Sequence, residues 1–255
     1  MRTEIIELKK KILEASYNSQ EGHIPSSFSI LDIIFCLFKG GYVFKKEKYL
    51  KNFILSKGHG SMALYAVLLN QNKINKKTFF GFCKKNSLFG GHPDMRKSKY
   101  ITASTGSLGH GLPIITGMAY ADVLNNINKK YYILIGDQEC LEGTTWESMF
   151  IINKYKLNNI TIIIDRNYSR NDAIPLGNIK NKLSGFSKNI LLIDGHNHNQ
   201  IYKALNKKFK NLNPKIIIAN TVKGYGLKEI QHNSWHHRFP KNEKELKNLI
   251  EDIKN

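Results

Sequence analysis

The sequence has no long hydrophobic run. No stretch of about 18 apolar residues occurs in its 255 residues, so we expect no membrane-spanning helix. The segment Met1–Leu8 is amphipathic and charged, and it lacks the apolar centre and the small-residue cleavage site of a signal peptide. Cysteine is scarce: Cys36, Cys83 and Cys140 lie far apart in no zinc-binding pattern, and their odd number argues against a disulfide framework. We therefore expect a cytoplasmic location.

Acidic residues are few, with 20 against 39 basic ones and a formal net charge of +19. Such a charge attracts nucleic acids, acidic partners and phosphorylated small molecules alike. The lysines are scattered, with short clusters such as Lys45–Lys48 and Lys207–Lys210, and no nucleic-acid recognition motif accompanies them. We interpret the excess as compositional bias on a solvated surface and expect no nucleic-acid partner.

Repeats, low-complexity linkers and hinges rich in proline and glycine are also missing. The length and the 41% hydrophobic content suit one large α/β domain or two small ones, and we interpret residues 1–255 as a single domain. We expect loops at 23–29 and 87–105. The expected helices cover 3–18, 30–38, 62–69, 112–125, 145–156, 198–209 and part of 241–255, a charged surface segment. The expected strands cover 53–56, 131–136, 160–165, 190–194 and 215–220.

Strands that alternate with helices predict an α/β fold with a mostly parallel sheet and helices on both faces. Ligands bind such sheets beyond the carboxyl ends of the strands. Gly136 and Asp137 follow one apolar run, and Asn167 follows the next. Carboxylate and amide oxygens are hard ligands suited to Mg²⁺, which often also takes phosphate oxygens. The pattern predicts a metal-bridged diphosphate cofactor.

A second motif, the run from Thr105 to Gly111, opens a predicted helix. Its glycines let the backbone approach a ligand, and the free N–H groups of a helix start favour an anion, although a tight loop explains the glycines equally well. Thr144 and Glu147 have the spacing of a capping box. Glu142 has no such explanation: it could join the metal site, bond across an interface, or be an exposed loop acid.

Histidines are concentrated in predicted loops, mostly beside glycine. A lone loop histidine is more often merely exposed, but several at one end of a sheet could donate to phosphate or hydroxyl oxygens and move protons. These residues are His23, His59, His92, His110, His196, His232, His236 and His237.

Taken in order, these segments resemble the transketolase family, in its N-terminal, diphosphate-binding portion, from about residue 5 to 240. No single motif is specific, but their order is. The motifs are Gly22–Ser26, Leu55–Ser61 with Leu64-Tyr65, Gly90–Pro93, Thr105–Gly111, Gly136–Glu139 with Glu142-Gly143, Trp146-Glu147 and Asn167, Asp194–His196, Val222–Gly226 and Trp235–His237.

The resemblance implies thiamine diphosphate held by Mg²⁺. The metal ligands would be Asp137, Asn167 and a backbone carbonyl near Ser169. His23, His92 and His237 would line the substrate channel, with Glu142 among the catalytic residues and His236 as the alternative to His237. The implied cofactor contacts are His59, Gly106, Ser107, Leu108, Gly136, Asp137, Gln138, Glu139 and Asn167.

The implied reaction transfers a two-carbon ketol unit from a ketose donor to an aldose or other carbonyl acceptor, with sugars or sugar phosphates as substrates. A full family member carries two more domains, one of which binds the aminopyrimidine of the cofactor. The family includes split members, and this chain looks like the N-terminal subunit of one. The implied partner is a C-terminal subunit with the pyrimidine-binding domain, in an α2β2 assembly.

Two positions depart from the family pattern. Gln138 stands where glycine is usual, which would matter only if the position requires a positive φ. Arg238 also replaces a glycine, and it could contact an anionic substrate or a partner, or be solvated. Two alternatives stay open: a non-catalytic binding or scaffold homologue, and another thiamine-dependent ketol or acyl transferase, such as one resembling deoxyxylulose-phosphate synthase. The donor, the acceptor and the pathway are not identified.

Overall fold

The computed structural model describes residues 1–45, 48–168, 175–231 and 235–253. Two residues named above, Ser169 and His232, lie outside these ranges. Among the described residues, no helix is both long and apolar enough to cross a membrane.

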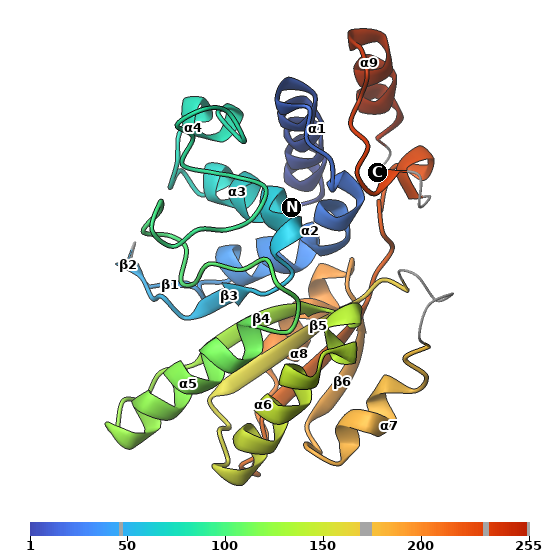
Figure 1. The fold of residues 1–255 in the computed structure, drawn as a ribbon. Helices are drawn as coiled ribbons and strands as arrows, with labels where there is room; N and C mark the ends of the chain where they lie inside the picture. The colour runs from blue at the N-terminus through green and yellow to red at the C-terminus, as the bar shows by residue number, and fades with distance from the viewer. Residues whose placement is uncertain (46–47, 169–174, 232–234, 254–255) are drawn as a thin grey trace.

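A five-stranded parallel sheet with the order β3-β4-β5-β7-β6 forms the centre of the fold (Figure 1). In the register of β4 and β5, Gly136 pairs with Asp165, so the two polar strand ends lie side by side. A separate antiparallel pair, β1 (Phe44–Lys45) and β2 (Lys48–Tyr49), was not predicted. The strands of the main sheet are β3 (Phe53–Leu55), β4 (Tyr131–Gly136), β5 (Ile160–Arg166), β6 (Ile190–Asp194) and β7 (Lys215–Asn220).

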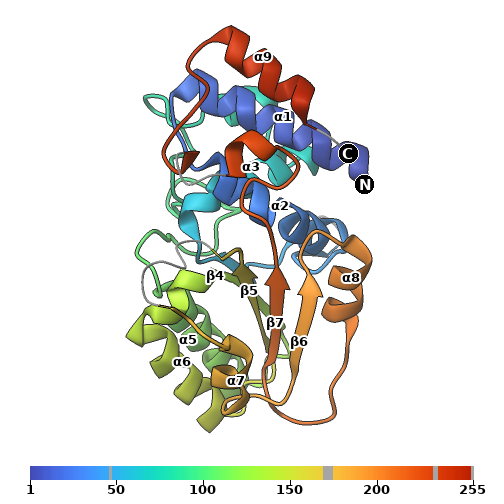
Figure 2. The ribbon, with the colours of Figure 1, turned by 90° about the vertical axis from the view of Figure 1, so that its right-hand side faces the viewer.

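Helices cover both faces of the sheet, as Figures 1 and 2 show, and the predicted fold class is confirmed. The α-helices are α1 (Arg2–Ser19), α2 (Ile24–Lys39), α3 (Ser61–Asn70), α4 (Lys76–Phe80), α5 (Gly111–Leu124), α6 (Gly143–Lys154), α7 (Ile179–Ser184), α8 (His198–Asn206) and α9 (Glu243–Asp252). Short 3-10 turns follow β3 (Gly58–Gly60) and β4 (Asp137–Leu141), and a third covers Lys228–Gln231.

The core is divided in two by the sheet because successive side chains of a strand point to opposite faces. In β5, Ile163 packs into the core shared with α1, α2, α3, α8 and α9. Its neighbours Ile162 and Ile164 pack into the core shared with α5, α6 and α7. Burial on both faces explains why these strands are continuous apolar runs.

The predicted loop at 23–29 is wrong, because α2 already begins at Ile24. Pro25 fits the first turn of a helix, where its missing N–H has no partner to lose. Phe28 in the next turn is completely buried. Packing of this segment therefore outweighs the loop preference that its proline and serines suggest. The expected C-terminal surface helix exists as α9, which lies along α1 and buries Leu249 (Figure 2).

Candidate active site

Loops from several parts of the chain meet beyond the carboxyl ends of β3, β4 and β5. The Thr105 hydroxyl donates to the Leu55 carbonyl at 2.7 Å, which attaches the glycine-rich loop to the end of β3. A Cβ at Gly58 would lie 3.0 Å from the Thr105 carbonyl oxygen and 3.1 Å from the His92 ring. The 3-10 turn after β3, the glycine-rich loop and the segment around His92 therefore converge here.

Asp137 begins the turn that follows β4, and its side chain is buried. Burial raises the pKa of its carboxyl to about 6, and the charge of Asp165 adds to this effect. The carboxylate accepts a hydrogen bond from the Tyr168 backbone N–H at 3.1 Å, which joins the end of β4 to the residue after Asn167. Gln138 does not have a positive φ, so the substitution of glycine by glutamine causes no backbone strain here.

Asp165, the last carboxylate of β5, is fully buried and forms an ion pair with the buried Lys57. Its Oδ1 accepts from the Thr221 hydroxyl, and its Oδ2 accepts from the Ser29 hydroxyl at 3.0 Å. Burial alone would raise the pKa of Asp165, but the Lys57 ammonium and these hydrogen bonds hold it below its usual value. The carboxylate is therefore charged and fixed in position.

Asn167 is oriented by this ion pair, because its Nδ2 donates to Asp165 Oδ2 at 2.7 Å. With the NH₂ group turned toward Asp165, the amide oxygen points the other way and is available as a ligand. Asp137, next to the paired Gly136, carries a carboxylate whose charge is unfavourable in this buried position. A buried carboxylate that lacks a cation, next to an oriented amide oxygen, fits the hard ligand set that Mg²⁺ prefers.

Gly109 needs the freedom of glycine in the loop before α5. Its φ is +77°, and a Cβ there would lie 2.6 Å from both the Glu142 Cβ and the Thr144 hydroxyl oxygen. The Gly109 N–H donates at 3.0 Å to the buried carboxylate of Glu139, which also accepts from Ser56 at 2.5 Å. Glu139 therefore connects the glycine-rich loop to the ends of β3 and β4.

The predicted capping box at Thr144 and Glu147 is wrong. Helix α6 begins at Gly143 with Glu142 as its N-cap residue, so Thr144 already lies inside the helix. Its hydroxyl donates to the Gly109 carbonyl at 3.0 Å instead. A tertiary contact to the glycine-rich loop thus replaces the local one. Glu142 is half-buried beside Gly109 at the start of α6.

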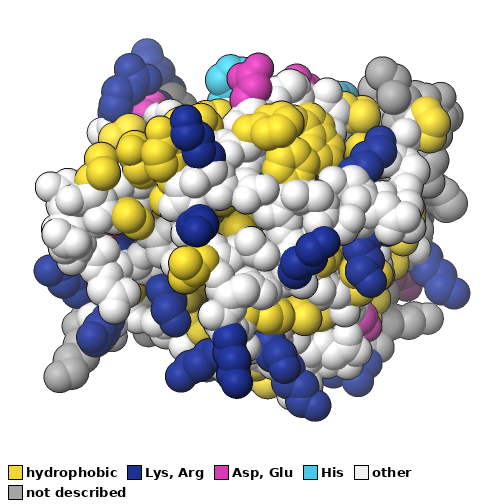
Figure 3. All heavy atoms as spheres, turned by 90° about the horizontal axis from the view of Figure 1, so that it is seen from below, with side chains coloured by type: hydrophobic (Ala, Val, Ile, Leu, Met, Phe, Trp, Pro, Cys, Tyr) yellow, Lys and Arg dark blue, Asp and Glu magenta, His cyan; other side chains and the backbone are white. Residues whose placement is uncertain are grey.

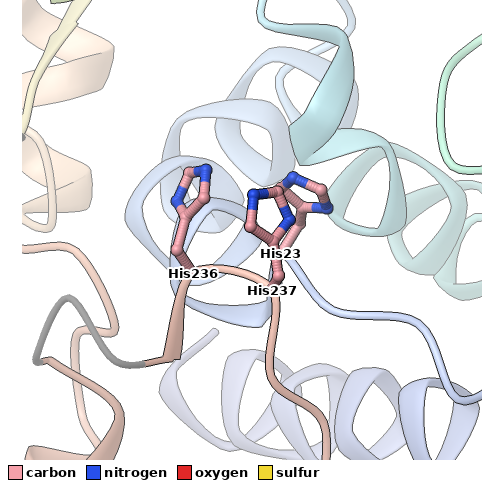
Figure 4. Close-up of side chains that lie close together, drawn as sticks. All are labelled: His23, His236 and His237. Carbon is pink, nitrogen blue, oxygen red and sulfur yellow. The ribbon is translucent and has the colours of Figure 1, made fainter.

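Four of the predicted loop histidines lie together. The ring of His23 is 4.7 Å from that of His237, 5.2 Å from that of His236 and 5.6 Å from that of His59, measured between centroids. Figure 4 shows His23, His236 and His237 with their rings on the same side of the chain. His92 is exposed and lies beside Gly58 and Gly106. The imidazoles come from segments that are far apart in sequence.

His23 is held in an uncommon conformation, with a φ of 66° at the N-cap of α2. Its backbone N–H donates to the His236 carbonyl at 3.0 Å. A Cβ at Gly22 would lie 2.5 Å from the backbone carbonyl carbon of His237, so the two segments touch through their main chains. Burial lowers the pKa of His23 to about 4, and the neighbouring histidines and Lys223 contribute to this shift. His23 is therefore neutral at pH 7.

Two predicted loop histidines are not part of this group. His110 is exposed at the N-cap of α5, where its Nδ1 lies 2.9 Å from the Leu108 carbonyl oxygen. His196 lies 3.1 Å from the buried carboxylate of Asp32, accepts from the Val222 N–H and stacks on Tyr225. These contacts give His196 a structural explanation.

Arg238 pairs with Glu245 of α9, and its guanidinium lies 4.2 Å from the Trp235 ring centroid. The arginine therefore attaches α9 to the segment that carries His236 and His237, and it is not a freely solvated side chain.

The ion pair of Lys57 and Asp165 was not predicted from the sequence. Lys57 belongs to the motif Leu55–Ser61, of which only His59 was given a role, and Asp165 closely precedes Asn167. A lysine flanked by serine and glycine at the end of a buried strand was the available signal, because lysine is almost never fully buried unless it is paired.

Residues 5–253 match the family described as transketolase, thiamine diphosphate binding domain. A subunit of the apulose-4-phosphate transketolase of Phocaeicola vulgatus is 30% identical over 94% of this chain and 91% of its own length. The subunit of the same name from Actinobacillus succinogenes is 31% identical, over 97% and 93%. The transketolase structure from Campylobacter jejuni has the same fold, with a TM-score of 0.83 at 24% identity. The chain is matched over 99% of its length but spans only 43% of that protein.

Proposed function

The chain belongs to the transketolase family, as its thiamine diphosphate binding domain, and on that premise we propose that it is the N-terminal, diphosphate-binding subunit of a two-chain transketolase. The observation that carries this proposal is the pair of strand ends at which Asp137 and the oriented amide of Asn167 lie side by side. Their oxygens suit the Mg²⁺ that would hold the diphosphate. We place the whole site in residues 1–255, as one domain.

The glycine-rich loop would contact the diphosphate with its backbone N–H groups at the start of α5. Gly106 and Ser107 are exposed and Leu108 is half-buried, so this part of the loop is accessible to a ligand. His59, half-buried between the loop and His23, would donate to a phosphate oxygen. Gly136, Gln138 and Glu139 would complete the cofactor site from the end of β4. Thiamine diphosphate, when bound, supplies the nucleophile and the electron sink for breaking a carbon–carbon bond.

The histidines would act on the sugar. His23, neutral at pH 7, can accept a proton from a substrate hydroxyl, and His92 and His237 are exposed at the mouth of the same site. The substrate class that we propose is a ketose donor with an aldose or other carbonyl acceptor. Phosphorylated sugars fit best, because the net charge of +19 attracts anions.

A partner chain with the pyrimidine-binding domain would complete the active site, in an α2β2 assembly. Both apulose-4-phosphate transketolase subunits are matched over nearly their full length, which supports a division into two chains. The outer face of α5 and α6 also supports a partner, because apolar side chains gather in patches between basic ones on the side seen in Figure 3. Glu142, at the start of α6, would bond across this interface. The exposed apolar residues of the two helices are Ile114, Val123, Leu124, Phe150 and Ile151.

Cofactor binding by this chain tests the proposal for the site. Asp137→Ala should weaken the binding of Mg²⁺ and thiamine diphosphate by about 100-fold or more, because even an outer-shell partner of a metal is worth about 10–100-fold. Asp194→Ala is the matched control, since Asp194 also ends a strand of the sheet but lies at β6. Calorimetry on the folded variants would contradict the assignment if Asp137→Ala bound the cofactor as the wild type does.

A further inference from the structure

Three histidines of the group described above lie close enough to share an ion. One ring nitrogen from each of His23, His236 and His237 can be chosen so that all three atoms lie within 4.8 Å of one another. The rings come from two segments whose main chains are hydrogen bonded, through the His23 N–H and the His236 carbonyl. Figure 4 shows the three imidazoles on one side of these segments. The backbone therefore fixes the arrangement.

The chemistry of the three ligands selects a transition metal. Imidazole nitrogen is a borderline ligand that suits Zn²⁺, Cu²⁺ and Ni²⁺, whereas Mg²⁺ prefers oxygen. Zn²⁺ binds histidine nitrogens at about 2.0–2.1 Å in a tetrahedral arrangement, which requires the nitrogens to be about 3.4 Å apart. Small rotations of the rings from the present separation satisfy this distance. His237 is exposed, so the fourth position would face solvent.

We propose that His23, His236 and His237 form a site for Zn²⁺, with water as the fourth ligand, separate from the magnesium site at Asp137 and Asn167. An occupied site would withhold three imidazoles from a sugar and so inhibit the enzyme. The inhibition rests on the proposed function, but the binding does not, because it requires only this chain.

Lys223 tunes the affinity of this site. Its ammonium lies 3.0 Å from Nδ1 of His236, and an ammonium can only donate, so Nδ1 carries the lone pair in this contact. A metal on Nε2 needs the opposite arrangement, with a proton on Nδ1 that is donated to an acceptor. Lys223→Gln supplies such an acceptor and removes a repelling charge. The substitution should therefore increase the affinity for Zn²⁺.

The test is calorimetric titration of the chain with ZnCl₂, without thiamine diphosphate. His237→Gln and His236→Gln should each weaken Zn²⁺ binding by at least about tenfold. Lys223→Gln should strengthen it by about tenfold, a gain that damage to the fold would not produce. His110→Gln is the matched control, because His110 is exposed and outside the group, and it should bind as the wild type does.

Co²⁺ in place of Zn²⁺ reports the geometry of the site. The intense visible absorption of tetrahedral Co²⁺ is expected in the wild type and should be lost in His237→Gln. The proposal is overturned if the wild type binds no Zn²⁺, if the histidine variants bind it equally well, or if the Co²⁺ spectrum is that of an octahedral ion. Zn²⁺ binding without inhibition of ketol transfer would leave the site standing and contradict only its effect on the enzyme.

Discussion

The Asn167 amide depends on a carboxylate that is not itself placed to bind the metal. Asp165 receives the NH₂ group of Asn167 and is held in turn by Lys57, Ser29 and Thr221. A side-chain amide can flip with little change in shape, so this hydrogen bond decides whether its oxygen or its nitrogen faces the magnesium site. Asp165 is therefore a positioning residue.

Asp165→Asn should weaken the Mg²⁺-dependent binding of thiamine diphosphate by about 10–100-fold, because it removes the charged acceptor that orients Asn167. It should also lower the free energy of unfolding by about 3–5 kcal/mol, because Lys57 is left as an unpaired buried charge. Calorimetry and urea unfolding measure the two effects.

Ser29→Ala separates positioning from stability. Ser29 donates to the same carboxylate oxygen of Asp165 but has no hydrogen bond to Asn167. This variant should lose about 1–3 kcal/mol of stability and keep its affinity for Mg²⁺ and the cofactor. Equal losses of affinity in the two variants would show that Asp165 acts through general stability and does not orient Asn167.

Among the loops and helices, the connection between α5 and α6 is the most constrained part of the site. Gly109 in the loop before α5 touches Glu142 and Thr144 at the start of α6, and Glu139 joins both to the strand ends. The N-terminal ends of two helices are thereby held at one side of the proposed cofactor.

Gly109→Ala should lower the free energy of unfolding by about 1–3 kcal/mol or more, because a Cβ is strained at a positive φ and would overlap Glu142 and Thr144. Gly117→Ala is the control within α5. A Cβ at Gly117 would have no heavy atom within 4 Å and the residue is exposed, so alanine should stabilise the helix by about 0.5–1 kcal/mol. Urea unfolding measures both, and an unchanged stability in Gly109→Ala would contradict this view of the loop.

Elements set by local patterns could be predicted from the sequence, and those set by tertiary contacts could not. The five strands of the sheet were predicted because apolar runs such as 160–165 are buried on both faces. The first turns of α2 and the cap of α6 were wrong because burial of Phe28 and the contact of Thr144 with Gly109 join distant segments. The Asp137 and Asn167 pair was predictable from its place at adjacent strand ends. Lys57 and Asp165 were missed because a partner 108 residues away leaves no local signal.

The exposed surface of the chain has two features that suit an incomplete enzyme. Its basic side chains are spread over the face seen in Figure 3, between apolar patches that a partner could cover. The chain also spans 43% of the solved Campylobacter jejuni transketolase, whereas it spans more than nine-tenths of the two apulose-4-phosphate transketolase subunits, 91% and 93%. We therefore expect cofactor binding and catalysis to be separable in this protein.

Ketol transfer by the isolated chain tests this division. The purified chain, supplied with Mg²⁺, thiamine diphosphate, a ketose phosphate donor and an aldose acceptor, should bind the cofactor but transfer no two-carbon unit. Addition of a partner chain with the pyrimidine-binding domain should produce the transfer. Robust transfer by this chain alone would contradict the account.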